Sequence, residues 1–290
     1  MMLPAIGLKS EEPIAASLAR AQAYILGRQS PQGGFCFYRG YYLEEPNLAD
    51  TWYGLAALAL LDVKPRNHPD HVAFVLARPV EPQPFALYYR VRALSVLSVD
   101  DPMDAEIRRA VASLQIHPLD PGSTSLSASL QRLRCVLWLK RHFNLPKHAG
   151  ETVQKLLESE SVKGGYGMPP NVLDTEAAIG VLKLCGRAIA SRTADFIHGM
   201  AEPQFGFRLT AGALSPNLET TCAGVMACSR LGKPIPYAED TMAFILSCQS
   251  GNGGFARTAD ALPTLALTHM SLATLIVHMG CVRHLQDADA

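Results

Sequence analysis

Apolar side chains recur along this chain with the period of a helix, and the helical stretches alternate with turns rich in glycine and proline. Residues Ala15–Gly27 carry apolar side chains at helical spacing and end at a glycine, which predicts a helix that stops there. The stretch Asp50–Leu61 is apolar on nearly all faces, which is typical of a helix buried all round. Prolines such as Pro69 are expected between helices. Later outer helices are predicted over Asp104–Leu114, Ala149–Ser159, Ala188–His198 and Tyr237–Cys248.

One phrase opens the apolar helices repeatedly. Residues 47–58 read NLADTWYGLAAL, residues 171–182 read NVLDTEAAIGVL, residues 217–227 read NLETTCAGVMA, and residues 267–275 read LTHMSLATL. Each copy follows a glycine–aromatic turn, and two weaker copies at 86–94 and 125–133 fill the gap. The equivalent positions are taken as Asp50, Ala86, Ser125, Asp174, Glu219 and Leu267. Their spacing of 36 to 49 residues predicts six helical hairpins, an all-α fold. Because each unit buries its apolar face against its neighbours, we expect one domain over residues 1–290.

Composition excludes some partners. The 26 Lys and Arg residues balance the 26 Asp and Glu residues, which argues against nucleic acid as the main partner. No apolar run reaches the roughly 18–20 residues of a membrane span, and the N-terminus has no signal-peptide pattern. Seven scattered cysteines without CxxC pairs predict a reduced, cytoplasmic protein.

Two motifs carry a family resemblance. The segment QSPQGGF at 29–35 precedes DTWYGL at 50–55, and QSGNGGF at 249–255 opens the last repeat in the same way. With these motifs the chain resembles the prenyltransferase/squalene-cyclase repeat superfamily, most closely the β subunits of protein prenyltransferases, as a bacterial-type homologue. The resemblance implies an α/α toroid of six inner and six outer helices, with a central cavity where the inner helices begin. It also implies a helical α-subunit-like partner.

The zinc site of the transferases is poorly matched. The resemblance implies ligands at Glu219, Thr221 and Leu267, of which only the carboxylate is a ligand type. Cys222 and His269 lie one and two residues beyond the expected places, and a helix turns by about 100° per residue. We therefore expect no metal, with Glu219, Cys222 and His269 as a weak alternative set.

The catalytic Asp motif of the terpene cyclases is also incompletely matched. In that resemblance the proton donor is the middle Asp of an Asp-x-Asp-Asp-Thr motif, and here its place is taken by Ala49 or Leu173. The remaining acids, Asp50 and Asp174, are expected first to cap their helices and second to act in catalysis. The candidate catalytic residues are thus Asp50, Asp174 and Glu219.

Aromatic and basic side chains define a candidate binding site. Aromatic walls suit an isoprenoid chain or a carbocation, whereas Phe35, Phe207 and Phe255 are expected to be packing within the repeats. Arg90 and Arg134 lie in helices that otherwise read as buried, so each needs an acidic partner or an anionic ligand. The candidate substrate-binding residues are Trp52, Tyr53, Tyr88, Tyr89, Arg90, Arg134, Arg208 and His269. One shared pocket is expected for Trp52, Tyr53, Tyr88, Tyr89, Ser127, Ala128, Glu176 and His269.

Two classes of function remain open from the sequence. The first is a transferase-like or cyclase-like protein that binds an isoprenoid or its diphosphate in an aromatic cavity. The second is a non-catalytic toroid that binds a lipid-like ligand or a peptide partner.

Overall fold

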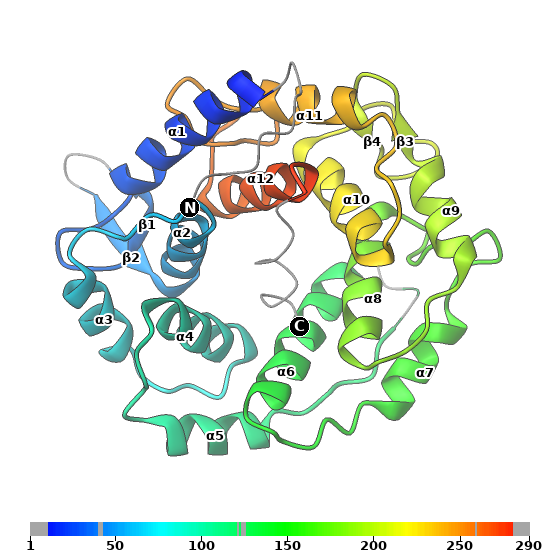
Figure 1. Ribbon diagram of the computed structural model, residues 1–290. Helices are drawn as coiled ribbons and strands as arrows, with labels where there is room; N and C mark the ends of the chain where they lie inside the picture. The colour runs from blue at the N-terminus through cyan, green and yellow to red at the C-terminus, as the bar shows by residue number, and fades with distance from the viewer. Residues whose placement is uncertain (1–10, 40–42, 121, 123–125, 259, 281–290) are drawn as a thin grey trace.

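The helices of the protein form two concentric rings (Figure 1). The computed structural model describes residues 11–39, 43–120, 122, 126–258 and 260–280, and these contain twelve helices. The inner ring consists of α2 (Leu48–Leu60), α4 (Pro84–Leu97), α6 (Leu126–His142), α8 (Val172–Leu184), α10 (Leu218–Leu231) and α12 (Leu265–His278). The outer ring consists of α1 (Glu11–Gly27), α3 (His68–Leu76), α5 (Asp104–Ser113), α7 (Gly150–Glu158), α9 (Ser191–Gly199) and α11 (Ala238–Ser247). Each inner helix packs on the next and α12 packs on α2, so the ring closes. The predicted α/α toroid is confirmed.

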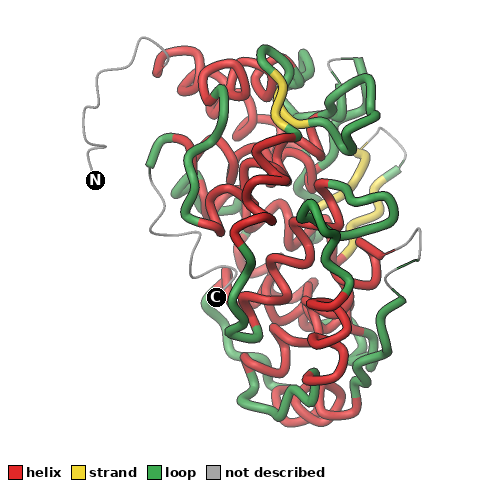
Figure 2. Tube along the Cα trace, turned by 90° about the vertical axis from the view of Figure 1, so that its right-hand side faces the viewer, coloured by secondary structure: helices red, strands yellow, loops and turns green. Residues whose placement is uncertain are grey.

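Strands are short and serve as connections (Figure 2). Strand β1 (Phe35–Arg39) pairs antiparallel with β2 (Glu44–Asn47), and β3 (Ala201–Glu202) pairs antiparallel with β4 (Gly206–Phe207). Of the helices that the structure describes, none combines the length and the apolar character that crossing a membrane would need.

The outer helix of the second repeat begins at a proline. Pro69 lies in the first turn of α3, so the expectation that it separates helices is wrong. The first turn is the part of a helix where a proline fits, because the N–H group that proline lacks would have no partner there.

The recurring phrase joins each inner helix to the turn before it. In α2 the side chain of Asn47 accepts the backbone N–H of Asp50 at 2.9 Å, so Asn47 is the N-cap. The hydroxyl of Thr51 donates to the carbonyl of Asn47 at 2.6 Å and accepts the backbone N–H of Phe35 at 3.0 Å. Asp50 therefore lies inside the first turn, and the prediction that it is the cap is wrong.

Helix α8 repeats this arrangement. Asn171 caps the helix, and its side chain accepts the backbone N–H of Asp174 at 2.9 Å. The hydroxyl of Thr175 accepts the backbone N–H of Tyr166 at 2.9 Å. Asp174 is consequently not a cap either. In both copies the Asn of the Asn-x-x-Asp-Thr phrase caps the helix, and the Thr bonds it to the preceding turn.

The fifth repeat corrects the sequence alignment by one residue. The backbone N–H of Phe207 donates to the hydroxyl of Thr221 at 3.2 Å, as that of Phe35 does to Thr51. Thr221 is therefore the equivalent of Thr51, and Glu219 precedes the position that is equivalent to Asp50. In the third repeat the proposed start, Ser125, lies outside the described residues.

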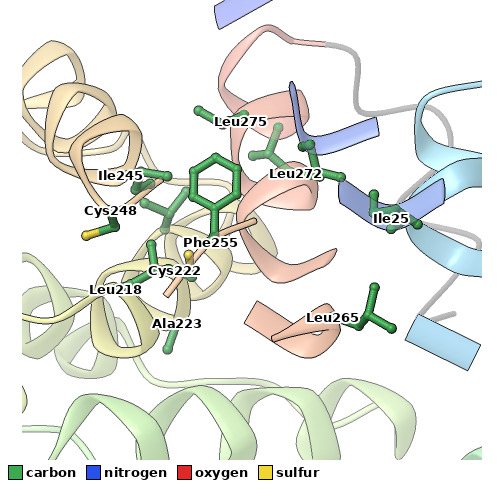
Figure 3. Packing of buried hydrophobic residues seen from close by; sticks show 14 of the residues in the cluster. Ile25, Leu218, Cys222, Ala223, Ile245, Cys248, Phe255, Leu265, Leu272 and Leu275 are labelled. Carbon is green, nitrogen blue, oxygen red and sulfur yellow. The ribbon is translucent and has the colours of Figure 1, made fainter. Parts of the chain in front are cut away.

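The aromatic residues of the turns fill the space between the rings. Phe35, Phe207 and Phe255 have no exposed surface, which confirms that they are packing within the repeats. Figure 3 shows the Phe255 ring enclosed by side chains of α10, α11 and α12. Helix α2 approaches Phe35 so closely that a Cβ atom on Gly54 would lie 2.4 Å from the ring. The inner helices thus turn one face to these aromatics and the other to the centre.

Candidate functional site

A cavity of about 630 Å³ lies at the centre of the inner ring, and all six inner helices contribute to its lining. This volume falls within the roughly 300–1,000 Å³ that is typical of small-molecule sites. The structure brings seven of the eight side chains predicted for one pocket into this lining, and Ala128 lies outside it. The seven are Trp52, Tyr53, Tyr88, Tyr89, Ser127, Glu176 and His269.

Helical periodicity selects the side chains of α4 that face the cavity. Tyr88, Tyr89, Arg92 and Val96 line it, at the spacing of one helix face. Arg90 stands two residues before Arg92, about 200° around the helix, so it faces away from the cavity. Arg90 was predicted in the binding site because the sequence pattern does not fix this register.

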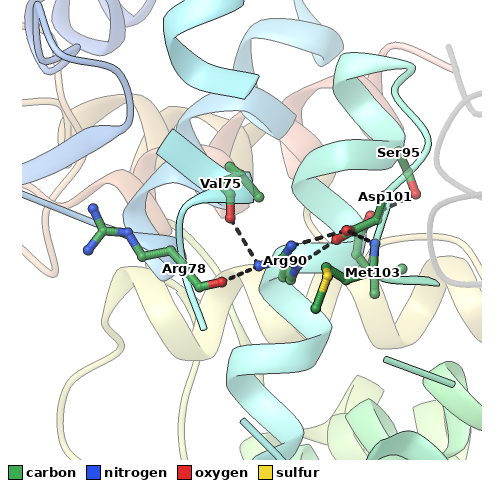
Figure 4. A network of polar contacts seen from close by, with 7 residues as sticks. Val75, Arg78, Arg90, Ser95, Asp101 and Met103 are labelled. Atoms are coloured by element: carbon green, nitrogen blue, oxygen red, sulfur yellow. Dashed lines mark hydrogen bonds and ion pairs between the residues drawn. The ribbon is translucent and has the colours of Figure 1, made fainter. Parts of the chain in front are cut away.

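Arg90 is instead part of the wall between the two rings (Figure 4). Its Nε atom lies 2.5 Å from Oδ2 of Asp101, and its Nη2 atom lies 3.1 Å from Oδ1. Its Nη1 atom donates to the carbonyl oxygens of Val75, at 3.2 Å, and Arg78. Of the two expected alternatives, an acidic partner and an anionic ligand, Arg90 has the acidic partner, because Asp101 in the loop after α4 reaches back to it.

Aromatic rings cover one side of the cavity. The ring centroids of Tyr53 and Tyr89 are 5.8 Å apart, and their hydroxyl oxygens are 3.5 Å apart. Burial, more than the Tyr53 hydroxyl, raises the pKa of Tyr89 far above its ordinary value. The His269 ring lies 5.8 Å from Tyr53 and 6.0 Å from Trp52, centroid to centroid. These residues from α2, α4 and α12 form a continuous aromatic surface.

A guanidinium group lies within this aromatic surface. The Cζ atom of Arg92 is 4.4 Å from the ring centroid of Trp52, 5.0 Å from that of Trp138 and 5.6 Å from that of Tyr88. Arg92 is 8% exposed. Its charge is thus held close to three aromatic rings.

Charged side chains gather on the side formed by α6, α8 and α10. Glu176 pairs with Arg134, at 3.6 Å between Oε1 and Nη1, and with Arg230. Gly180 leaves room for both arginines, because a Cβ atom there would lie 3.2 Å from Cδ of Arg134. Glu219 also lines the cavity and pairs with Arg257 at 2.8 Å.

Arg230 also lines the cavity and was not predicted from the sequence. A signal for it existed, because Glu219, Ala223, Met226 and Arg230 follow one another at i, i+4, i+7 and i+11 on α10. Arg208 was predicted in its stead. Arg208 pairs with Glu202 at 2.8 Å beside β4 and is not among the residues that line the cavity.

Comparison with known proteins places the chain in a family. The model of the prenyltransferase alpha-alpha toroid domain matches residues 7–82 and 74–289. The chain belongs to this family. No curated protein matches the chain.

Two solved structures share the toroid. Candida albicans protein geranylgeranyltransferase-I complexed with GGPP has a TM-score of 0.64 at 13% identity, over 81% of this chain and 84% of that chain. A type II terpene cyclase from Scytonema in complex with its substrate, geranylgeranyl dihydroxybenzoate, has a TM-score of 0.62 at 12% identity, over 93% and 98% of the two chains. At such identities the likeness shows the fold alone.

The two aspartates of the toroid's recurring phrase do not line the cavity. An oxygen of Asp50 accepts from the side chain of its own cap, Asn47, at 2.6 Å, and Asp174 accepts from Asn171 in the same way at 2.6 Å. Burial raises the pKa of both carboxyl groups, and these hydrogen bonds oppose the rise. Both acids therefore lie in the wall, bonded to the helix starts, and of the three predicted catalytic acids Glu219 is the one that lines the cavity.

The residues do not fit the zinc site of the transferases. In the part of the chain that the structure describes, no three His, Cys, Asp or Glu side chains gather closely enough to hold a metal ion. Glu219, Cys222 and His269 all line the cavity but form no such group. Burial raises the pKa of the Cys222 thiol to about 12, so a neutral thiol is favoured over the thiolate that binds zinc.

Proposed function

We propose that this toroid binds an isoprenoid, or an isoprenoid diphosphate, in its central cavity. The observation that carries the proposal is the division of the lining into an aromatic side and a side with arginine side chains. A hydrocarbon chain would lie against the first side and an anionic head group against the second.

The aromatic side suits a long, flexible, apolar chain. Trp52, Tyr53, Tyr88, Tyr89 and His269 offer broad ring faces, and each CH₂ group buried against them contributes about 0.8 kcal/mol. Neighbouring small residues on α2 and α12, such as Ala56 and Ala273, leave space for the chain. We propose these aromatic residues as the binding site for the isoprenoid tail.

The arginine side suits a diphosphate. Guanidinium groups bind phosphate oxygens through paired hydrogen bonds, which are stronger than those between neutral groups. Arg134 and Arg230 both contact Glu176, so a ligand with several anionic oxygens would compete with the Glu176 carboxylate for both cations. We propose Arg134 and Arg230 as the head-group site, and we leave out Arg90 and Arg208.

A reaction would need an acid or base within reach of the ligand. Glu219 is our candidate, since it lines the cavity. Incubation with isoprenoid diphosphates and mass spectrometry of the products tests for a transferase or cyclase activity. The position of Asp50 and Asp174 in the wall favours the alternative, a toroid that binds a lipid-like ligand without catalysis. Binding without any product, in the wild type and in Glu219→Gln alike, would support that alternative.

Titration calorimetry tests the binding proposal. We expect geranylgeranyl diphosphate to bind more tightly than geranylgeraniol, and Arg134→Gln or Arg230→Gln to weaken diphosphate binding by at least about tenfold. Arg208→Gln is the matched control and should leave the affinity unchanged. Equal affinity for the diphosphate and the alcohol, or equal losses in the control, would contradict the assignment.

Two further predictions from the sequence stay proposals. A helical partner subunit would be detected by purification of the protein together with the products of neighbouring genes, and a cytoplasmic location by fractionation. Both tests are independent of the cavity.

A further inference from the structure

Arg92 stands in a box of aromatic rings within the cavity. We define the aromatic box as Trp52, Tyr88 and Trp138, whose centroids lie 4.4, 5.6 and 5.0 Å from the Cζ atom of Arg92. The rings meet edge to face, Trp52 with Tyr88 at 6.4 Å and 79°, and Tyr88 with Trp138 at 5.3 Å and 80°. Three different helices, α2, α4 and α6, supply the box.

Such a box is a binding site for a positive charge. A cation within about 6 Å of an aromatic centroid is attracted by the ring, and proteins bind quaternary ammonium groups in cages of this kind. An apolar cavity with an empty box would therefore attract a cationic ligand or stabilise a carbocation. In this protein the cation in the box belongs to the chain.

We infer that Arg92 occupies the aromatic box in place of a ligand and thereby selects against positively charged ligands. This inference rests on the proposed function for the isoprenoid part of the ligand. The cavity accepts isoprenoids with an anionic or a neutral head and disfavours those with an ammonium head. A positive charge that develops along the chain gains no stabilisation from the box, so the box gives no support to a cyclisation.

A change of charge alone must be separated from the opening of the box. Arg134 offers a matched control, because it lines the same cavity and carries the same charge but is not one of the groups held over these rings. Arg92→Ala vacates the box, Arg134→Ala removes an equal charge elsewhere, and Arg92→Lys keeps a cation at the same position. Circular dichroism and thermal unfolding would establish that each variant is folded.

Tryptophan offers a direct readout. The chain has two tryptophans, and both belong to the box. Tetramethylammonium, a cation without a tail, should perturb both indole N–H signals in NMR spectra of Arg92→Ala. The wild type, Arg134→Ala and Arg92→Lys should bind it at least about tenfold more weakly.

A tail-matched series then tests the selection itself. For the wild type, geranylgeranyltrimethylammonium should bind at least about tenfold more weakly than geranylgeraniol, and Arg92→Ala should abolish or reverse this difference. The inference would be overturned if the affinity for geranylgeranyltrimethylammonium rose equally in Arg92→Ala and Arg134→Ala, or did not rise in Arg92→Ala. If neither geranylgeraniol nor its diphosphate binds any form, the proposed function fails, but the tetramethylammonium titration still tests the box.

Discussion

The outward and inward faces of α4 each bury an arginine, and the two faces satisfy the charge by different means. Arg90, on the outward face, is held by the carboxylate of Asp101 and by the carbonyl oxygens of Val75 and Arg78. Arg92, on the inward face, lies over the rings of the aromatic box. The outward arrangement is a closed polar network that fixes the wall. The inward arrangement holds a charge against aromatic rings, beside the cavity where a ligand can lie.

The two faces of other inner helices also differ in what packs against them. Gly54 of α2 faces the turn aromatic Phe35 between the rings, whereas Gly180 of α8 lies beneath the arginines of the cavity. Residues of the outward face should therefore control stability, and residues of the inward face should control binding.

Loss of Arg90 should have the largest effect. Arg90→Met leaves Asp101 buried without its cation, so we expect the free energy of unfolding to fall by about 3–5 kcal/mol. Arg92→Met places an apolar chain against aromatic rings and should cost clearly less. Urea denaturation measures both. Equal losses would erase the difference between the two faces, whereas partial recovery in Arg90→Met/Asp101→Leu would support the ion-pair account.

The two glycines give the next largest contrast. The Cβ atom of Gly54→Ala would lie 2.4 Å from the fully buried ring of Phe35, so we expect a loss of about 1–3 kcal/mol from overpacking. Gly180→Ala meets the flexible chains of Arg134, at 3.2 Å, and Arg230, at 4.0 Å, and gains helix propensity. Thermal unfolding should therefore show destabilisation in Gly54→Ala alone. A similar loss in Gly180→Ala would show that the inward face is packed as tightly as the outward face.

Loss of a helix cap should lower the free energy of unfolding by less than the overpacking at Gly54. Asn217 accepts the backbone N–H of Thr220 at 3.0 Å, and Thr220 accepts that of Asn217, which forms a capping box. Asn217→Ala should cost about 0.5–2 kcal/mol, whereas Asn217→Ser keeps an acceptor and should cost much less. Chemical denaturation would decide. An equal loss in both variants would mean that the asparagine acts by some means other than capping.

Substitution of Asp174 should have the smallest effect on the free energy of unfolding, and this effect should depend on pH. Burial raises its pKa in the folded protein, so the folded state holds the proton more tightly than the unfolded state does. As pH rises from the ordinary value of about 4 through the raised pKa, the contribution of Asp174 to the free energy of unfolding falls. Asp174→Asn should remove this decline, so its stability relative to wild type should improve with rising pH in urea denaturation. Glu151→Gln is a control of opposite sign, because Lys155 lowers the pKa of Glu151. A relative stability of Asp174→Asn that falls with pH would contradict this prediction.

The fold could be predicted from the sequence because repetition specifies it. Glycine–aromatic turns precede α2, α8, α10 and α12, the Asn-x-x-Asp-Thr phrase begins α2 and α8, and six helical hairpins close the ring. The roles within the phrase could not be read from it, since Asn47, Asp50 and Thr51 are all types that cap helices. Only the hydrogen bonds show that Asn47 caps and that Thr51 holds the turn.

The site could be predicted only in part. Trp52, Tyr53, Tyr88 and Tyr89 were found because they lie near the starts of α2 and α4, which the repeat alignment locates. Arg90 was misplaced because a shift of two residues along α4 moves an arginine from the cavity face to the opposite face. Arg230 was missed because it lies in the last turn of α10, far from the phrase, where no repeated residue marks the cavity face.

We propose that the inward faces of the inner helices bind an isoprenoid diphosphate, and a crystal structure of the protein with geranylgeranyl diphosphate would test this binding. We expect the isoprenoid chain against Trp52, Tyr88 and Tyr89, phosphate oxygens within hydrogen-bond distance of Arg134 and Arg230, and Arg92 still in the aromatic box. A ligand bound outside the inner ring, or a diphosphate with neither Arg134 nor Arg230 in contact, would contradict this proposal.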